Sequence, residues 1–466
     1  MLHESAPITK APLLCQLSAE ELTVRYASGE ISPVEVAKAA IDHAHHVQNA
    51  LNAFTFIDSK GALIAARDSE HRWRMNRPLS ESDGIPTTIK DLVWVDGWTV
   101  RFGSRTTSQL AMRGDAPSVA LLRRAGAVFI GQSASPEFGW KPVTDSPLRG
   151  ITRNPWKSSK TPGGSSGGAA VAAATGAGVF HLGTDGGGSI RVPASFTGIV
   201  GLKPSFGRVP NYPPSGFFSV SHTGPMTRSV DDAARMLRAM SGRDTRDWSQ
   251  GAGELRGLTL SSVDPTTLKI GYWADPPVGP LDPEVKNAVD ALAAALGSRG
   301  AVVESFNLPP EDILEMFNRH WLAGAALRFS SLSDADRGLV DPGFRAAAEE
   351  GRFLTAMDLL EAQVTRARFG AAMDALLSKV DVVVSPATAM PAFDVGCDVP
   401  PNCGMQRWTE WTSFSYPLNL SGQPACVVPC GVTRTGLPIG LQIIGPRGED
   451  ARVLSVAKAI ELLIDA

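Results

Sequence analysis

The sequence predicts an α/β fold in which a central sheet is covered by helices on both faces. Short apolar runs alternate with amphipathic segments along the 466 residues, of which 43% are hydrophobic and 20% charged. Such alternation is typical of sheets that pack helices against both faces. Length alone is compatible with two or three domains or with one large α/β domain. The chain contains neither an internal repeat nor a low-complexity tail.

The first part of the chain, about residues 1–75, is predicted to be helical. Ser18 and Glu21 have the spacing of a capping box, and Gly29 fits the end of that helix. The same signal returns at Ser32, where proline follows at the first helical position. Two helices are therefore expected before residue 52.

Three histidines, His43, His45 and His46, lie on the second of these helices. They lack the glutamate of an HExxH zinc motif. We therefore expect a solvated helix face here rather than a metal site.

The remaining elements follow from hydrophobic periodicity. Seven apolar runs predict strands at 84–95, 127–132, 178–184, 269–274, 380–387, 425–432 and 439–445. Amphipathic segments predict helices at 118–126, 229–242, 283–300 and 451–465. The less regular stretch at about 243–268 is predicted to be an insertion or linker. The small-residue run from Thr161 to Thr184 is predicted to be a buried passage from a helix into a strand.

The composition argues against several classes of partner. The formal net charge is −3, which does not favour a nucleic acid. The first residues do not read as a signal peptide. The chain has no run of about 18 strongly apolar residues, so no membrane span is expected. We expect a cytoplasmic protein with no nucleic acid and no membrane partner.

The cysteine count is odd, which predicts reduced thiols rather than a disulfide framework. The cysteines do not have CxxC spacing, and no histidine follows His320, so a metal site is not expected. The five are Cys15, Cys397, Cys403, Cys426 and Cys430.

Two glycine–serine loops, 163–168 and 186–189, are the first candidates for chemistry. A phosphate-binding loop needs a lysine after its last glycine, which the first loop lacks. Asp185 precedes the second loop and would repel a phosphate. The five residues 163–167 match the G-x-S-x-G nucleophile elbow. That motif needs a downstream acid and histidine and a buried strand before it. No histidine follows His320, and the residues before Gly163 do not read as a buried strand. We therefore discount both the phosphate-binding loop and the nucleophile elbow.

A lysine-activated serine is the next alternative, because a buried lysine can lose its proton and act as a base. Ser455 and Lys458 fit S-x-x-K, but they lie on a terminal amphipathic helix without the companion motifs, so a structural role is expected. Lys90 lies in a mostly apolar predicted strand, where an unused lysine is costly. The alternative for Lys90 is a lysine that reaches solvent and pairs with Asp91.

Longer motifs point to one family. From Gly163 to Ala194 the chain reads GGSSGGAAVAAATGAGVFHLGTDGGGSIRVPA. Related motifs occur at 84–91, 131–140, 150–156, 198–210, 223–237 and 419–445. Together they resemble the amidase signature family of serine hydrolases. The resemblance implies a single amidase signature domain over 1–466, with a central mixed β-sheet, and a signature core at about 84–240. It implies no cofactor and no metal.

The resemblance implies a Ser–cis-Ser–Lys triad. Ser189 matches the nucleophile, Ser165 the bridging serine with a cis peptide bond, and Lys90 the base. An acyl-enzyme is then expected.

Further roles around this triad follow from residue chemistry. Gly186, Gly187 and Gly188 have no side chains, so their N–H groups can turn inward as an oxyanion hole. Supporting roles are expected for the neighbouring polar residues Ser166, Asp185 and Arg191. Position 186 is glycine where many members carry threonine, valine or isoleucine, which predicts a looser loop.

Aromatic residues in loop-like stretches are the only clue to the substrate. Trp140, Phe217, Phe218, Trp411 and Phe414 are expected to line a pocket, and Trp408 and Tyr416 belong to the same set. The alternative is that most of them pack the loops onto the sheet. If they line a pocket, the substrates are small hydrophobic or aryl amides, or carbamates (urethanes), with water as the second reactant.

Two alternatives to a free-standing amidase are a glutaminase-type subunit of a tRNA-dependent amidotransferase and a non-catalytic subunit that retained the fold. The run FGWKPVTDS at 138–146 differs from the usual amidotransferase sequence, which favours a lone enzyme. A monomer or homodimer is expected.

Overall fold

The computed structural model describes residues 11–250 and 257–465 of the chain. The helices are α1 (Leu13–Gln16), α2 (Ala19–Ser28), α3 (Pro33–Leu51), α4 (Ser59–Arg74), α5 (Pro117–Arg124), α6 (Gly167–Thr175), α7 (Arg191–Thr197), α8 (Val230–Met240), α9 (Pro283–Ser298), α10 (Ile313–Ser330), α11 (Asp334–Arg337), α12 (Pro342–Gly351), α13 (Ala356–Leu377), α14 (Pro417–Ser421) and α15 (Asp450–Asp465). Short 3₁₀ helices are η1 (Glu137–Gly139), η2 (Phe218–Val220), η3 (Pro265–Thr267) and η4 (Trp408–Glu410). The strands are β1 (Phe54–Ile57), β2 (Pro86–Lys90), β3 (Val128–Ser133), β4 (Asp145–Ser146), β5 (Gly150–Ile151), β6 (Phe180–Asp185), β7 (Val200–Lys203), β8 (His222–Thr227), β9 (Lys269–Tyr272), β10 (Val302–Ser305), β11 (Val382–Pro386), β12 (Ala425–Val432) and β13 (Pro438–Ile444).

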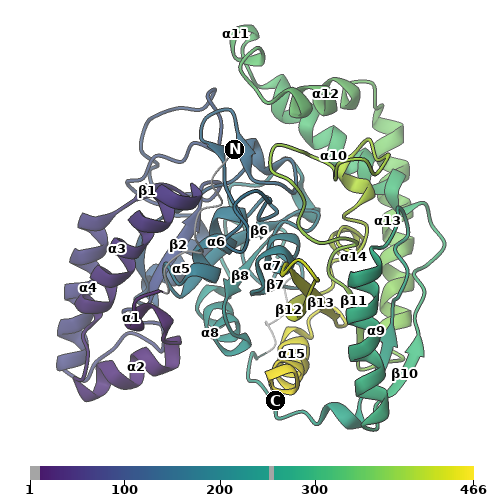
Figure 1. The fold of residues 1–466 in the computed structure, drawn as a ribbon. Coiled ribbons are helices and arrows are strands. Elements are labelled where there is room, and N and C mark those ends of the chain that lie inside the picture. Colours follow the sequence, from purple (N-terminus) through teal and green to yellow (C-terminus); the bar gives the residue numbers. More distant parts are fainter. Residues whose placement is uncertain (1–10, 251–256, 466) are drawn as a thin grey trace.

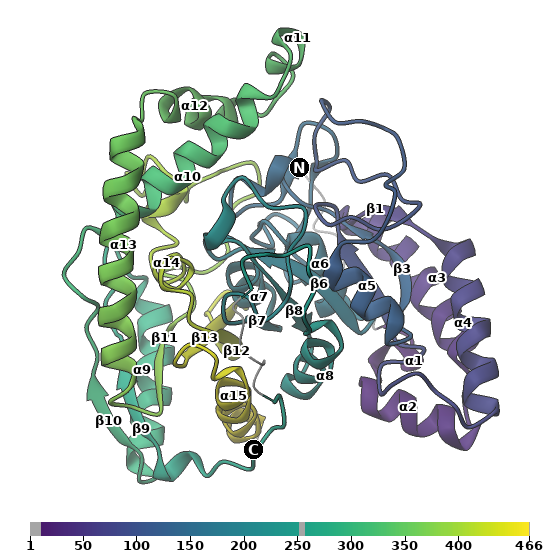
Figure 2. The same cartoon turned by 180° about the vertical axis from the view of Figure 1, so that it is seen from behind.

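One mixed sheet organises the described residues. Eleven of their strands pair in the order β1-β3-β2-β6-β8-β7-β12-β13-β11-β9-β10. β2 runs parallel to β3 and β6, whereas β6 and β8, and β12 and β13, are antiparallel. In Figure 1 and Figure 2, α1–α4 lie at the β1 end of this sheet, and α9 and α13 lie at the β10 end. The predicted α/β fold with a mixed sheet is confirmed.

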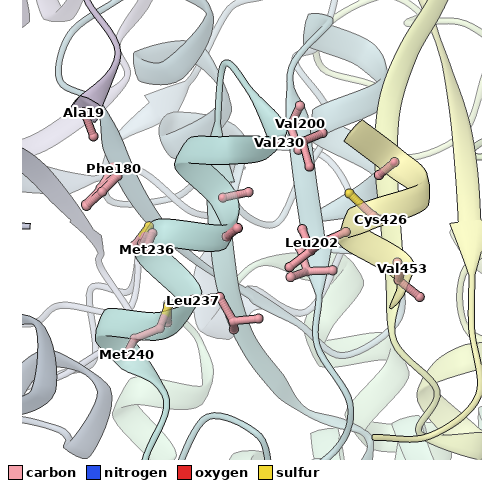
Figure 3. Close-up of a cluster of buried hydrophobic side chains, with 14 of the residues drawn as sticks. Ala19, Phe180, Val200, Leu202, Val230, Met236, Leu237, Met240, Cys426 and Val453 are labelled. Atoms are coloured by element: carbon pink, nitrogen blue, oxygen red, sulfur yellow. The ribbon is translucent and has the colours of Figure 1, made fainter. Parts of the chain in front are cut away.

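Helices cover both faces of the sheet, as β12 illustrates. Successive side chains of a strand point to opposite faces. Cys426 and Val428 belong to a hydrophobic cluster with α8 and α15, whereas Val427 lies between them and packs in a cluster with α6 and α7. Figure 3 shows part of the first cluster, where Val200 and Leu202 of β7 lie beside helix α8.

The small-residue segment forms the buried helix-to-strand passage that the sequence predicts. α6 consists of glycine, alanine, valine and threonine, and nearly all of it is buried. A Cβ at Gly168 would lie 2.3 Å from the Ala134 nitrogen, so the absence of a side chain allows this close approach. Gly176 ends the helix at φ 77°, and β6 follows.

The N-terminal region contains the predicted helices and one strand that was not predicted. Capping boxes at Ser18 and Ser32 begin α2 and α3, as expected. β1 is an antiparallel edge strand on β3. The expectation of a solvated face is wrong for His43, which is buried with its Nε2 2.8 Å from the Thr175 oxygen. His45 and His46 are exposed.

The other differences are the end of one strand and several elements that were not predicted. β2 ends at Lys90 rather than at residue 95, because the backbone turns there and the Val93 amide donates to the Lys90 carbonyl at 3.0 Å. The described parts of 243–268 hold only the 3₁₀ helix η3. Besides β1, the α-helices and strands that were not predicted are α7, α10 to α14, β4, β5, β7, β8 and β10. In the described part of the chain, no helix is long and apolar enough to cross a membrane.

Candidate active site

Lys90 lies at the end of β2, surrounded by hydroxyl groups. Its Nζ is 2.7 Å from Ser165 Oγ, 2.9 Å from Ser166 Oγ and 2.9 Å from Thr184 Oγ1. The side chain is fully buried, so it does not reach solvent or pair with Asp91 as the alternative interpretation proposed. Burial lowers the pKa of the Lys90 amine well below its usual value. Burial thus shifts the amine towards its neutral form, which has a basic lone pair.

The hydrogen bonds around this amine restrict where its lone pair points. A neutral amine has two N–H donors and one lone pair, so of three hydroxyl neighbours one must donate to it. Ser166 Oγ already donates to the Thr184 carbonyl at 3.1 Å and therefore accepts from Lys90. In the neutral form of Lys90, the lone pair therefore faces the hydroxyl of Ser165 or that of Thr184.

The two glycine–serine loops meet beside Lys90. The Gly164–Ser165 peptide bond is cis, as the family resemblance implies. A Cβ at Gly164 would lie 2.7 Å from the Val143 carbonyl carbon, so only glycine fits this contact. The Ser166 amide donates to the Ser189 carbonyl oxygen at 3.1 Å, which places the second loop against the first. The structure therefore brings Lys90, Ser165 and Ser189 into one region.

A buried ion pair shapes the second loop. Arg191 Nε and Nη2 donate to the two oxygens of Asp185 at 3.0 and 2.9 Å, and both side chains are fully buried. Burial alone would raise the pKa of the Asp185 carboxyl, but Arg191 and Asn419 outweigh burial and hold that pKa below its usual range. Asp185 therefore stays ionised and accepts from the amides of the loop that it precedes.

Groups far along the chain complete this network. Arg191 also donates to Asn419 Oδ1 at 2.6 Å and to Gln442 Oε1 at 2.8 Å. Asn419 Nδ2 in turn donates to the backbone oxygen of Asp185 at 3.0 Å and to its carboxylate at 2.9 Å. Sequence reasoning missed Thr184, Asn419 and Gln442, although the last two lie in the quoted motif at 419–445.

The three loop glycines differ in what their amides do. The Gly188 amide donates to Asp185 Oδ1 at 2.8 Å, so it is not available to an oxyanion, contrary to the expectation. Neither the Gly186 amide nor the Gly187 amide donates a hydrogen bond to another described residue. Gly188 has φ 123°, and a Cβ there would lie 2.7 Å from Ser415 Cβ.

Aromatic rings face the glycine loop. A Cβ at Gly186 would lie 3.1 Å from the Trp321 ring, and one at Gly187 would lie 2.8 Å from the Phe317 ring. Phe217 stacks on Trp321 with ring centres 3.8 Å apart, and Trp408 meets Trp321 edge-on at 5.2 Å. We call Phe217, Phe317, Trp321 and Trp408 the aromatic wall. Trp321 thus occupies the room that a larger residue at position 186 would need.

The structure brings only some of the predicted pocket residues to this wall. Phe217 belongs to the wall, whereas Trp140 contacts it only through its backbone: its carbonyl oxygen accepts from Trp321 Nε1 at 3.2 Å, and its ring lies over Gly343. Trp411 is buried and stacks on Phe196, and Phe414 is buried against Trp273. Phe218 points elsewhere and stacks on Trp248. Trp411, Phe414 and Phe218 therefore pack outside the wall, in line with the packing alternative.

The other candidate chemistries find no support. Among residues 11–250 and 257–465, no group of three or more histidine, cysteine or acidic side chains could hold a metal ion. Ser455 donates to the Ala451 carbonyl, and Lys458 pairs with Asp231 and Glu461, so both have structural partners. The five cysteines are free thiols.

The chain is similar to known proteins over nearly its whole length. A family model described as Amidase matches residues 35–454. An acylamidase from Rhodococcus erythropolis is 34% identical over 458 residues, which covers 96% of this chain and 95% of that protein. A glutamyl-tRNA(Gln) amidotransferase subunit from Myxococcus xanthus (strain DK1622) is 33% identical over 475 residues, covering 96% and 97%. A solved bacterial aryl acylamidase of the amidase signature enzymes matches with a TM-score of 0.86 and 28% identity, over 96% of each chain.

Proposed function

The chain belongs to the amidase signature family of hydrolases, and we propose that it is an amidase for small hydrophobic or aryl amides. The observation that carries the aryl preference is the aromatic wall beside Gly186 and Gly187. Flat rings there favour an apolar or aryl group next to the scissile bond. Carbamates are the second class we propose, because the same attack on a carbonyl releases an amine from them.

The proposed catalysis begins with proton transfer through the two serines. Neutral Lys90 takes the proton of Ser165 while Ser165 takes that of Ser189, and Ser189 Oγ forms a bond to the substrate carbonyl carbon. The 2.7 Å separation of Lys90 Nζ and Ser165 Oγ supports the first transfer. The negative charge moves to the carbonyl oxygen.

The amides of Gly186 and Gly187 are the proposed donors to this oxyanion. They have no other acceptor among the described residues, whereas the Gly188 amide is held by Asp185. One such donor typically contributes about 3–4 kcal/mol to lowering the barrier. The ion pair of Asp185 and Arg191 supports this role, because it keeps the loop in one shape before the substrate arrives.

The C–N bond then breaks, and the proton on Lys90 returns through Ser165 to the leaving nitrogen. An acyl group remains on Ser189 Oγ. Water gives its proton along the same route as it attacks the acyl carbon, and the acid departs as Ser189 regains its proton. The three residues end each cycle in their starting protonation states, so no cofactor enters the balance.

Turnover of a panel of amides tests the proposal. We expect 4-nitroacetanilide and an N-aryl carbamate to be hydrolysed faster than acetamide or glutamine. A fluorophosphonate should label Ser189, as read by mass spectrometry of the tryptic peptide. Activity on glutamine alone, and only with partner subunits, would assign the chain instead to the amidotransferase type that the Myxococcus xanthus relative represents. No labelling of Ser189 would point to a non-catalytic subunit.

A further inference from the structure

Helix α13 is apolar on two opposite sides, and only one of them is covered by other described residues. The buried residues on the covered side, where α13 packs on α10 and α14, are Ala362, Phe369, Met373 and Leu377. About half a helical turn away, apolar side chains recur at spacings of three and four residues and are exposed. They are Met357 (64% exposed), Leu360 (58%), Val364 (58%), Ala367 and Ala371. We call these five residues the outer stripe.

The outer stripe is held on the surface, because the other side of α13 is anchored. Arg366 Nε donates to the Leu420 oxygen at 2.6 Å, and its Nη2 donates to the Ser219 oxygen at 3.0 Å. Phe369 belongs to the same hydrophobic cluster as Phe317 of α10. In Figure 1 and Figure 2, α13 runs along the outside of the molecule at the β10 end of the sheet. The helix therefore presents the outer stripe to whatever lies outside this chain.

The spacing of the outer stripe is that of a helix–helix interface. Single exposed apolar residues are ordinary, but a continuous row at the a and d spacing is typical of a helix that packs against another helix. A helix that is apolar on both sides is normally buried on both sides. Phe353, in the turn before α13, is 87% exposed and lengthens the apolar surface. The outer stripe therefore has the pattern of an interface whose second helix is not among the described residues.

The outer stripe is wide at one end and narrow at the other. Its large side chains, Met357 and Leu360, lie near the start of α13, and its alanines lie near the end. Beside the alanines runs a groove of about 1060 Å³, lined from α13 by Ala367, Gly370 and Ala371 and from the far side by 420–422 and 446–448. One end of this surface therefore offers protruding side chains, and the other end offers room to receive them.

Opposite charges flank the outer stripe on one side. Glu361 and Arg368 are both exposed and are seven residues apart, which is about two helical turns. Glu361 pairs with Arg319 of α10, whereas Arg368 makes no ion pair with another described residue. A second α13 that ran in the opposite direction would present a carboxylate to Arg368 and a guanidinium to Glu361. Side-chain size and charge therefore both match the same surface in reverse.

We propose that the outer stripe is the contact between two copies of this chain, with their α13 helices antiparallel about a two-fold axis at the level of Thr365. Leu360 of one copy then lies against Ala371 of the other. Val364 lies against Ala367 in the same way. Because the axis repeats every contact, one surface serves both copies and the pairing closes on itself. The proposal does not rest on the proposed function.

The same arrangement accounts for the groove and for the charges. Phe353 and Met357 lie beyond Leu360 in the chain direction that points towards the groove of the second copy, so their side chains enter it. Glu361 of each copy lies beside Arg368 of the other. A membrane surface as the alternative occupant would not need charges of both signs beside the apolar row.

Sedimentation equilibrium over a range of protein concentrations tests the pairing. A single helix face is a small interface, so we expect monomer and dimer to interconvert with a Kd of about 1–10 μM. Val364→Glu places a carboxylate on each side of the axis and should raise this Kd by at least about 100-fold. Val24→Glu is the matched control, because Val24 is equally exposed (62%) but lies on α2, at the β1 end. It should leave the Kd unchanged, and melting curves should show that both variants fold.

A charge exchange tests the antiparallel register. Arg368→Glu should weaken the dimer by about fivefold to tenfold, because it then meets Glu361 of the second copy. Adding Glu361→Arg to that variant should restore the parent Kd. A dimer that survives Val364→Glu, or a double variant that stays weakened, would overturn the proposal. So would a parent protein that is monomeric at every concentration, and binding of that monomer to vesicles of phosphatidylcholine and phosphatidylglycerol would assign the outer stripe to a lipid surface instead.

Discussion

The glycine-rich side of the candidate active site is fixed by hydrogen bonds, whereas the opposite side is made of stacked rings. Lys90, the two serine loops and Asp185 are joined by contacts of 2.6–3.4 Å that each need one donor and one acceptor. Phe217, Phe317, Trp321 and Trp408 meet with ring centres 3.8–5.8 Å apart. Ring packing has broader geometric tolerance than hydrogen bonding.

This difference predicts which kinetic constant a substitution on each side should change. On the hydrogen-bonded side, loss of one group leaves a buried partner unsatisfied and misdirects the proton path, so we expect the rate to fall. On the aromatic wall, a smaller side chain removes contact area, so we expect weaker binding of the substrate. Substitutions on the hydrogen-bonded side should therefore lower kcat, and substitutions on the aromatic wall should raise KM.

Ser189→Ala should give the largest effect, a fall in kcat of at least about 10⁴-fold. The substitution removes only one oxygen, so the thermal unfolding temperature should stay within a few degrees of that of the parent enzyme. Initial rates with 4-nitroacetanilide and a melting curve measure both quantities. Activity within tenfold of the parent would show that Ser189 is not the nucleophile.

Lys90→Met should lower kcat nearly as far, because the proton of Ser165 then has no base. In the parent enzyme the rate should fall as the pH is lowered, since the Lys90 amine must be neutral to accept a proton. Its pKa lies well below the usual lysine value, so the neutral form persists far below pH 10. The pH profile of kcat/KM checks this prediction, and a rate that rises towards acid would contradict it.

Thr184→Val should have an intermediate effect, a fall in kcat of about 5-fold to 150-fold. Valine keeps the shape of threonine but cannot accept from Lys90, so an amine N–H is free to turn towards Ser165. Thr184→Ser retains the hydroxyl and is the matched control, expected to keep most of the rate. Equal rates in the two variants would mean that the 2.9 Å contact does not orient the amine.

Phe217→Ala should give the smallest effect, and in KM rather than in kcat. Loss of the ring that stacks on Trp321 should raise KM for 4-nitroacetanilide by about fivefold to tenfold. The KM for acetamide, which has no ring, should change little. A fall in kcat with unchanged KM would place Phe217 on the hydrogen-bonded side of the comparison.

The two sides also differed in how far the sequence could predict them. Lys90 was identifiable because a lysine in an apolar strand is costly, and the serine loops were visible from their glycines. Thr184 gave no signal, because a threonine at the end of a strand is ordinary until a buried amine faces it. Asn419 and Gln442 were missed because their partner, Arg191, is more than 200 residues away in sequence.

The aromatic wall was only partly predictable, for a reason that lies in α10. This helix carries Phe317 and Trp321, and its buried residues include His320, Leu322 and Gly324 as well, so no single apolar stripe marks it. Loop position also misled the assignment of Trp411 and Phe414, because rings in loops pack on the sheet as readily as they line a pocket. Whether a loop ring lines a pocket or packs on the sheet depends on contacts between segments far apart in the sequence.

The network that anchors Asp185 and Arg191 joins segments that are synthesised at different times. Lys90, Ser165 and Ser189 are all synthesised in the first half of the chain, but Asn419 and Gln442, which complete the loop network, arrive near its end. A nascent chain that stops before α14 holds the whole proposed triad yet lacks both Asn419 and Gln442, which complete the network of its nucleophile loop. Completion of the network around Asp185 and Arg191 therefore waits for the C-terminal segment that carries Asn419 and Gln442.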